Sequence, residues 1–267
     1  MKTWTMKAVA ATALTVVSLL AASGAQATLL GRDLNNDGTY DAYYDNVLNI
    51  SWLADANYAM TSGRSATGRL LWSEAMDWAG QLNIYGVSAW RLPTLAPING
   101  SAFLPEFSNN ATTDTGTGIE GLGWANSEGT PVSELGWMYY GNLGGVNAVL
   151  PSGFVVPGSC ANWVISGSAP NFCLPNSGPF SNIQRTAYWA NLESFMIPSS
   201  PVRAAFVLDM DIGYQQDVQF GNSLFAWAVH DGDVGGNPVP APGTLALLVA
   251  GFLGWMGVKR SRHRAGA

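Results

Sequence analysis

Four oxygen-bearing side chains near the N-terminus have the spacing of a calcium-binding loop. In the segment DLNNDGTYD they are Asp33, Asn35, Asp37 and Asp41. This spacing lets the side chains converge on one cation, while Gly38 permits the sharp turn and the carbonyl of Thr39 assists. Tyr44 stands where such loops carry a bidentate acid. The segment therefore predicts either a Ca²⁺ site, the one cofactor that the sequence suggests, or an acidic turn that opens a β-hairpin.

An aromatic stretch in the middle of the chain is a second candidate site. The segment WMYYGNLGG contains Trp137, Tyr139 and Tyr140, followed by a glycine-rich loop. Exposed rings at these positions would stack on a sugar ring, so they are our candidate ligand-binding residues. The alternative is that all three are buried aromatic residues of the core.

The chain has two cysteines, Cys160 and Cys173, in one loop-rich stretch. In an oxidising compartment they would pair with each other, and the small loop closed in this way would add roughly 3 kcal/mol of stability. A zinc site is disfavoured, because His230 is the only histidine between residues 28 and 237 and zinc needs more nitrogen or sulfur ligands than remain.

Residues for hydrolytic catalysis are scarce. The chain has no G-x-S-x-G or H-E-x-x-H motif, and we expect His230 to be an exposed residue at a strand end. A guanidinium such as that of Arg91 can hold a carboxylate or a sugar hydroxyl. The sequence favours a structural arginine paired with a buried acid or stacked on Trp90. We therefore predict that the protein is not an enzyme, with a glycoside-cleaving pair of carboxylates as the alternative.

The N-terminus has the pattern of an export signal. Lys2 and Lys7 supply positive charge, residues 8–22 form an apolar core, and a small-x-small site ends at Ala27. We expect a signal peptide over residues 1–27, with Thr28 as the first mature residue. A membrane anchor is the weaker interpretation, because the apolar run is short and a cleavage site follows it.

The C-terminal segment, residues 238–267, carries a second targeting pattern. An apolar run over residues 244–258 is followed by a basic tail over 259–264, which favours a cytoplasmic position for that end. The short proline motif before the run contains Val239, Pro240, Pro242 and Gly243. Together these features resemble the PEP-CTERM sorting signal, although Ala241 stands where that signal usually has Glu. The alternative is an ordinary C-terminal membrane anchor.

The resemblance to a PEP-CTERM signal implies a route out of the cell. Its first stage is a precursor held in the inner membrane by the C-terminal helix. An exosortase-type processing enzyme then cuts the precursor, which is delivered to the cell surface or to an exopolysaccharide matrix. We therefore expect an exported protein whose partners are the processing enzyme and extracellular polysaccharide.

Charge limits the partners of the mature domain, residues 28–237. Its six Arg and no Lys against eighteen Asp and Glu leave a formal charge of −12. Such a surface repels nucleic acid and anionic membranes. It also disfavours polyanionic glycans unless a divalent cation bridges them. The length is suited to one domain with a substantial core.

The best-defined element is a helix that begins near Leu71. Its apolar face carries Trp72, Ala75, Met76, Ala79 and Leu82. Ser73 is its expected cap, with Glu74 in the first turn, where the helix dipole favours a carboxylate. The helix should end near Asn83–Gly86. Pro93 then forces an extended conformation on the residue before it, so WRLPT leaves the helix as a rigid strand or turn.

This helix and the segment WRLPT, residues 90–94, resemble the Lcl C-terminal domain family. Its members carry a W-x-x-A-x-x-W-A-x-x-L helix followed by G-x-x-x-W-R-L-P-T, and the likeness covers roughly residues 44–234. Residues 45–58 resemble an upstream strand of the family, and residues 188–190 and 225–234 its closing strands. The resemblance implies a compact extracellular α+β domain that is C-type-lectin-like. It also implies glycan binding, as reported for some members, and no established catalysis.

Short apolar runs separated by loops predict the rest of the sheet. We expect strands over residues 48–52, 186–193, 203–210 and 225–230. Loops rather than helices connect them, which favours antiparallel pairing in an α+β domain. We therefore expect an exported, non-catalytic, glycan-binding or adhesive protein. The first alternative is a structural matrix protein that acts through protein–protein contacts, and the second is a polysaccharide-cleaving enzyme.

Overall fold

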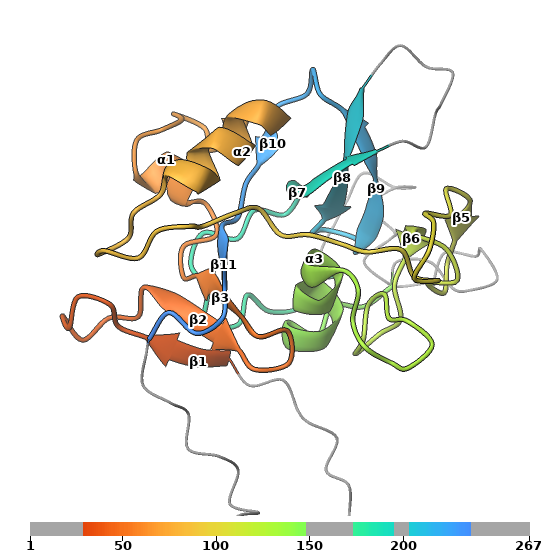
Figure 1. Cartoon of the computed structure of the whole chain (residues 1–267), viewed down its shortest axis with the longest axis horizontal. Helices are drawn as coiled ribbons and strands as arrows, with labels where there is room; N and C mark the ends of the chain where they lie inside the picture. The colour runs from red at the N-terminus through yellow and green to blue at the C-terminus, as the bar shows by residue number, and fades with distance from the viewer. Residues whose placement is uncertain (1–28, 148–172, 195–202, 236–267) are drawn as a thin grey trace, which may run out of the picture.

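The computed structural model describes residues 29–147, 173–194 and 203–235, which form a mixed α+β domain of short strands and few helices (Figure 1). The predicted signal peptide, its cleavage site at Ala27 and Thr28, and the sorting segment 238–267 lie outside the described residues. No helix within those residues is long and apolar enough to cross a membrane. The structure records Cys173 as disulfide-bonded, and its predicted partner, Cys160, lies outside the described residues.

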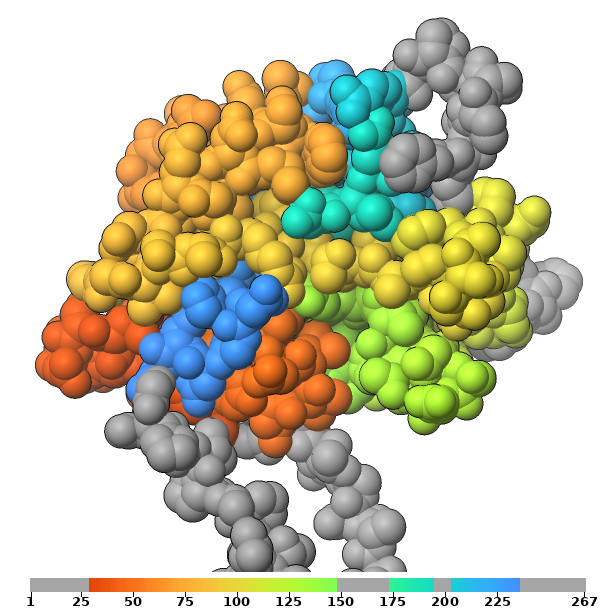
Figure 2. All heavy atoms as spheres, viewed as in Figure 1, coloured from red at the N-terminus to blue at the C-terminus, as the bar shows by residue number. Residues whose placement is uncertain are grey.

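The first sheet joins the two ends of the described chain. Its antiparallel strands have the order β1-β2-β3-β11, with bounds β1 Leu29–Arg32, β2 Ala42–Asp45, β3 Ile50–Leu53 and β11 Val229–Asp231. In Figure 2 the last described residues, in blue, lie against the first strands, in red and orange. An ion pair between Arg32 and Asp233 at 2.6 Å closes this end of the domain.

The second sheet has seven strands in the order β4-β10-β7-β8-β9-β6-β5. Their bounds are β4 Arg69–Leu70, β5 Phe107–Ser108, β6 Thr115–Thr117, β7 Ala187–Ser194, β8 Ala204–Asp209, β9 Tyr214–Gln219 and β10 Leu224–Phe225. Most neighbours are antiparallel, as predicted, but β10 pairs parallel with β7 and β5 pairs parallel with β6. The strands predicted over residues 186–193 and 203–210 are confirmed as β7 and β8.

The predicted closing strand over residues 225–230 is wrong as a single strand. Its two ends are β10 and β11, which belong to different sheets. Trp227 lies between them, fully buried, and its indole N–H donates to the carbonyl oxygen of Leu53 at 2.8 Å. The alanines on either side of this tryptophan are also buried, and small residues let the chain cross closely from one sheet to the other.

Strand β3 is buried on both faces, although the alternation of Leu48, Ile50 and Trp52 with Asn49 and Ser51 in the sequence is typical of a half-buried strand. Ser51 is the one polar residue of β3. Its side chain is fully buried, and its hydroxyl donates to the carbonyl oxygen of Gly232 at 2.8 Å. The hydroxyl oxygen of Ser51 also accepts the backbone N–H of Val234 at 3.2 Å. The chain that follows β11 therefore covers the face that would otherwise meet solvent.

The predicted helix is confirmed as α2, Trp72–Gln81, with Ala75, Trp78 and Ala79 buried. The expected cap is wrong. Leu71 holds the cap position, and its backbone N–H donates to the Glu74 carboxylate at 3.0 Å. Glu74 thus satisfies one of the donors that a helix start leaves unpaired. A one-turn helix, α1, Tyr58–Thr61, precedes α2.

The sequence did not predict helix α3, Glu134–Trp137, or the π-helix η1, Met138–Asn142, that continues it. Ser133 caps α3 by accepting the N–H of Gly136 at 3.1 Å. Residues five apart share a face in a π-turn. Trp137 and Asn142 therefore both reach Asp45, donating to its Oδ2 at 2.9 and 2.7 Å. Asp45 is fully buried and also accepts two backbone N–H groups.

Arg91 connects three parts of the domain. Its backbone pairs with Val229 of β11 through two hydrogen bonds of 2.8 Å. Its guanidinium contacts both oxygens of Glu134 at 2.8 Å and Asp231 at 2.5 Å. Burial lowers the pKa of Arg91, but these hydrogen bonds and charges raise it by more, so the net shift is upward. The structural interpretation of this arginine is confirmed.

Replacing Arg91 by leucine should destabilise the protein by about 3 kcal/mol, because Glu134 would stay largely buried without its partner. The matched change Asp231→Asn should cost less than about 1 kcal/mol, since the Asp231 side chain is 78% exposed and exposed pairs contribute little. Urea unfolding of both variants measures the difference. Equal losses would contradict the assignment of the stabilisation to the pair with Glu134.

Two acids, one at the end of β8 and one in the turn that follows it, are destabilising at neutral pH. Burial raises the pKa of Asp209, and burial with the nearby charge of Asp209 raises the pKa of Asp211. Asp233 has the opposite shift, because its hydrogen bond to Arg32 lowers its pKa. The first two groups therefore favour folding when protonated, and the third favours it when ionised.

Stability should increase as the pH falls from neutral to about pH 4. Raised carboxyl pKa values make the folded state bind more protons than the unfolded chain, an advantage complete below the ordinary aspartate pKa of about 4. The stabilisation from Asp233 is lost only below that value, so stability should then fall. Urea unfolding across this range tests the profile. The double variant Asp209→Asn, Asp211→Asn should flatten the rise, and an unchanged profile would contradict its assignment to these acids.

Candidate functional site

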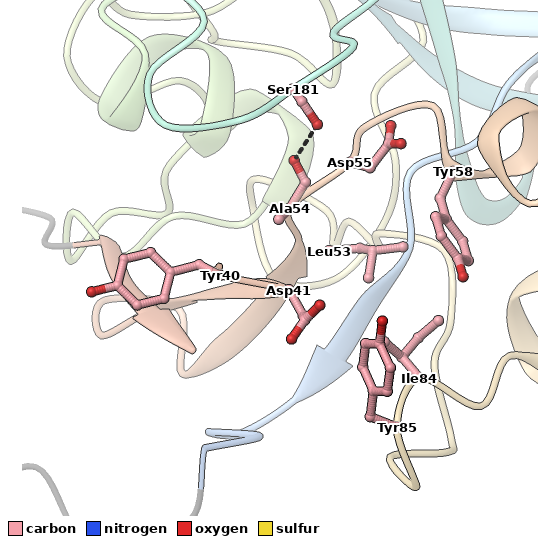
Figure 3. Close-up of a pocket in the computed structure, with 9 residues that line it drawn as sticks. All are labelled: Tyr40, Asp41, Leu53, Ala54, Asp55, Tyr58, Ile84, Tyr85 and Ser181. Carbon is pink, nitrogen blue, oxygen red and sulfur yellow. Dashed lines mark hydrogen bonds between the residues drawn. The ribbon is translucent and has the colours of Figure 1, made fainter. Parts of the chain in front are cut away.

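A pocket of about 160 Å³ lies where four segments of the chain meet (Figure 3). Tyr40 and Asp41 come from the end of the β1–β2 loop. Leu53 is the last residue of β3, and Ala54, Asp55 and Tyr58 follow it. Ile84 and Tyr85 come from the turn after α2, and Ser181 comes from the segment before β7. The wall therefore combines three tyrosines and two aspartates with Leu53, Ala54, Ile84 and Ser181.

Hydrogen bonds between backbone groups tie three of these segments together under the pocket. Ala54 donates to the carbonyl oxygen of Asp41 at 2.9 Å and accepts from the N–H of Ser181 at 3.0 Å. Ala56 in turn donates to the carbonyl oxygen of Ser181 at 3.0 Å. Because the backbone is paired in this way, the pocket is formed without a ligand.

Tyr85 stands on a two-residue hairpin turn and is 61% exposed. Ile84 and Val87 exchange hydrogen bonds of 2.9 and 3.0 Å across the turn, and the Asn83 side chain accepts the N–H of Gly86 at 2.8 Å. Both central residues have positive φ, +50° for Tyr85 and +93° for Gly86. This turn type prefers Asn or Gly, and a bulky residue in it costs about 1 kcal/mol or more. The fold tolerates strain to present an aromatic ring.

Tyr40 is the second exposed ring at the pocket, with 54% of its surface accessible. Its ring lies over Gly31, where a Cβ atom would come within 2.4 Å of it, and it meets the edge of Tyr43 at 5.8 Å between ring centres. A glycine in β1 therefore makes room for this ring. In the view of Figure 3 the Asp41 carboxylate lies between the rings of Tyr40 and Tyr85.

The two aspartates of the pocket differ in their free acceptor positions. Asp55 accepts the N–H of Asn57 at 2.8 Å and the hydroxyl of Thr61 at 2.6 Å, one on each oxygen, and so supports α1. Asp41 accepts the N–H of Leu34 on Oδ2 at 2.8 Å. No donor among the described residues bonds to Asp41 Oδ1, which is left for a ligand or solvent.

The predicted calcium loop leads directly into this pocket, since Asp41 belongs to both. The loop joins β1 to β2 and therefore opens a β-hairpin, an arrangement that does not test calcium binding. Asp33 accepts the N–H groups of Asp37 and Gly38 at 3.2 and 2.8 Å, and the Asn35 amide donates to Asp37 at 2.8 Å. Within the described residues no group of three or more His, Cys, Asp or Glu is arranged to hold a metal ion. Calcium binding by Asp33, Asn35, Asp37 and Asp41 stays a prediction.

The predicted ligand-binding aromatics are buried, which corrects that prediction in favour of its alternative. Trp137 is 7% exposed, and Tyr139 and Tyr140 are fully buried. The hydroxyl of Tyr140 accepts the N–H of Gly118 at 3.1 Å and lies 2.8 Å from the carbonyl oxygen of Gly213, and burial raises the pKa of both tyrosines. With no ring face at the surface, they cannot stack on a sugar.

Sequence reasoning missed the tyrosines that do reach the surface. Tyr85 lies in the Asn83–Gly86 segment, which the sequence marks only as a helix end. An aromatic residue inside a turn sequence is a usable signal, because turn tips are exposed and tolerate such a residue only at a cost. Tyr40 carries no comparable signal, since its position depends on Gly31 in the neighbouring strand.

The remaining candidate residues do not add a catalytic arrangement. His230 is half-buried in β11, and its ring meets the edge of Trp90 at 5.6 Å between centres. A second hollow, of about 250 Å³, is lined by residues between Leu174 and Arg185 of one segment. This hollow shares no lining residue with the pocket of Tyr40 and Tyr85, although Phe180 and Asn182 flank Ser181 in the chain.

Comparisons of the chain with protein-family models, with curated proteins and with solved structures found no match. The geometry of the pocket therefore carries the functional argument.

Proposed function

We propose that the protein is an exported, non-catalytic glycan-binding protein whose ligand enters the pocket between Tyr40 and Tyr85. The observation that carries this proposal is an exposed tyrosine held in a strained turn beside a carboxylate oxygen with no donor. Sugar rings present an apolar face of C–H groups and an edge of hydroxyls. The pocket offers a partner for each, namely aromatic faces and the Oδ1 atom of Asp41.

The size of the pocket favours a ligand that extends beyond it. Its volume of about 160 Å³ is below the roughly 300 to 1,000 Å³ of sites that enclose a whole small molecule. One sugar ring would enter, and the rest of the chain would lie across the exposed ring of Tyr40. This mode of binding suits a polysaccharide of the cell surface or matrix, which is where the targeting patterns at both chain ends would bring the protein.

The hydrogen bonds of the acids in the pocket favour a binding role over glycoside cleavage. Glycoside cleavage uses two carboxyl groups, one of them with a raised pKa. Both oxygens of Asp55 are occupied by Asn57 and Thr61. Asp209 and Asp211, whose pKa values burial raises, do not line the pocket. The pocket therefore holds one free carboxylate oxygen, which suits binding.

Replacing Tyr85 by asparagine should weaken glycan binding by about fivefold or more, since a stacking contact contributes roughly 1 kcal/mol or above. Stability should be unchanged or rise by up to about 1 kcal/mol, because asparagine tolerates the positive φ. Glycan-array binding and thermal unfolding measure the two effects. Phe107→Asn is the matched control, since Phe107 is 53% exposed and does not line the pocket. Equal binding by both variants would contradict the proposed site.

Calcium should bind the Asp33–Asp41 loop with a dissociation constant on the order of 10⁻⁴ to 10⁻³ M, the range of extracellular sites that lack a full ligand set. Titration calorimetry and the melting temperature with and without excess Ca²⁺ test this. Asp37→Asn should abolish the heat of binding, whereas Asp77→Asn, an exposed change on α2, should retain it. No heat at millimolar Ca²⁺ with the unchanged protein would leave the loop as an acidic turn only.

A further inference from the structure

We propose that the pocket prefers glycans that carry a free amino group, with the protonated amine bound at Oδ1 of Asp41. This inference depends on the proposed glycan binding and names the chemical class of the ligand. It follows from the charge of the pocket, from the position of the unpaired oxygen, and from the aromatic rings on either side of it.

The pocket contains negative charge with no positive side chain to balance it. Asp41 and Asp55 line it, and no Lys, Arg or His does so. The Asp33–Asp41 loop, which ends at the pocket, adds Asp33 and Asp37. An unbalanced carboxylate at a binding surface favours a cation and disfavours a second anion.

Arg32 and Arg91, which stand near pocket residues in the sequence, are paired with acids elsewhere. Arg32 donates to both oxygens of Asp233, at 2.6 and 2.7 Å, and lies over the ring of Tyr44 at 5.5 Å from its centre. Arg91 is held by Glu134 and Asp231. Neither arginine lines the pocket, so neither can neutralise a sulfate or a uronate there.

The geometry around Asp41 is suited to an ammonium group. Its Oδ1 accepts no hydrogen bond from the described residues, while its Oδ2 is fixed by the N–H of Leu34. In Figure 3 the carboxylate is directed into the space toward Tyr85, and the rings of Tyr58 and Tyr85 border that space. A protonated amine there gains a charge-assisted hydrogen bond and the electrostatic attraction of an aromatic face. A neutral acetamido group at the same position gains neither.

The test compares oligosaccharides that differ only at nitrogen. A glucosamine tetramer and its fully N-acetylated counterpart are titrated at mildly acidic pH, in EDTA so that no divalent cation neutralises Asp41, together with a uronate tetramer. The glucosamine tetramer should bind about tenfold more tightly than the acetylated one, and the uronate should bind least.

Two variants with the same change of charge identify the residue. Asp41→Asn keeps the shape of the side chain and should reduce the preference for the amine to about twofold or less. Asp77→Asn removes an exposed charge on α2, away from the lining, and should leave the preference intact. A preference lost equally in both variants would mean that net charge alone attracts the amine, and would overturn the assignment to Asp41.

The remaining outcomes separate this inference from the proposed function. If the acetylated tetramer binds as tightly as the amine, or more tightly, the preference for amines is wrong and glycan binding stands. If none of the three oligosaccharides binds the unchanged protein, while Tyr85→Asn is as inert as the parent on a glycan array, both proposals fail together.

Discussion

The pair formed by Arg91 and Glu134 is the constraint on which the arrangement of this domain depends. The arginine follows Trp90, whose buried indole donates to the carbonyl oxygen of Val87 at 3.0 Å. That carbonyl belongs to the hairpin turn that carries Tyr85. The Glu134 carboxylate also accepts the N–H of Thr94 at 2.8 Å, and Glu134 is the first residue of helix α3. One ion pair, largely shielded from solvent, therefore fixes the turn at the pocket, strand β11 and the start of α3 relative to one another.

Local sequence patterns were enough to predict those helices and strands that form from one continuous segment with a regular apolar pattern. The helix α2 was predictable from its apolar period, and β7 and β8 from apolar runs between loops. The split of β10 from β11 was not, because the crossing at Trp227 depends on the carbonyl of Leu53, which lies far away in sequence. The burial of Ser51 likewise depends on the chain after β11. A sequence pattern shows only the periodicity of the segment itself. The crossing at Trp227 and the burial of Ser51 each depend on contact with a segment that is distant in the sequence.

The same limit explains why the aromatic residues of the site were assigned wrongly. The segment around Tyr139 is rich in aromatic residues, but it is buried. Glycines such as Gly145 and Gly213 let other segments pack directly on the ring of Tyr139. Tyr85 is an isolated aromatic residue in the sequence, and Tyr40 stands close to Tyr43 and Tyr44. The two come to one pocket only after α2 and the β1–β2 hairpin are in place. A binding surface made of single residues from several turns leaves no composition signal, although the positive φ at Tyr85 marks its position once the backbone is known.

Asp41 is common to the calcium loop and to the pocket, and one carboxylate cannot serve two cations fully. Its Oδ2 already accepts the N–H of Leu34, so a Ca²⁺ ion and a ligand amine would compete for the remaining oxygen. With the loop empty, the pocket carries the charges of Asp41 and Asp55, and in the proposed mode of binding it would attract an ammonium group. With Ca²⁺ bound, that charge is neutralised and the metal itself becomes the nearest positive partner for hydroxyl or carboxylate groups. The predicted binding of Ca²⁺ and the proposed binding of an amine are thus opposed by electrostatics. The Ca²⁺ concentration around the protein would then decide which glycans bind in the pocket.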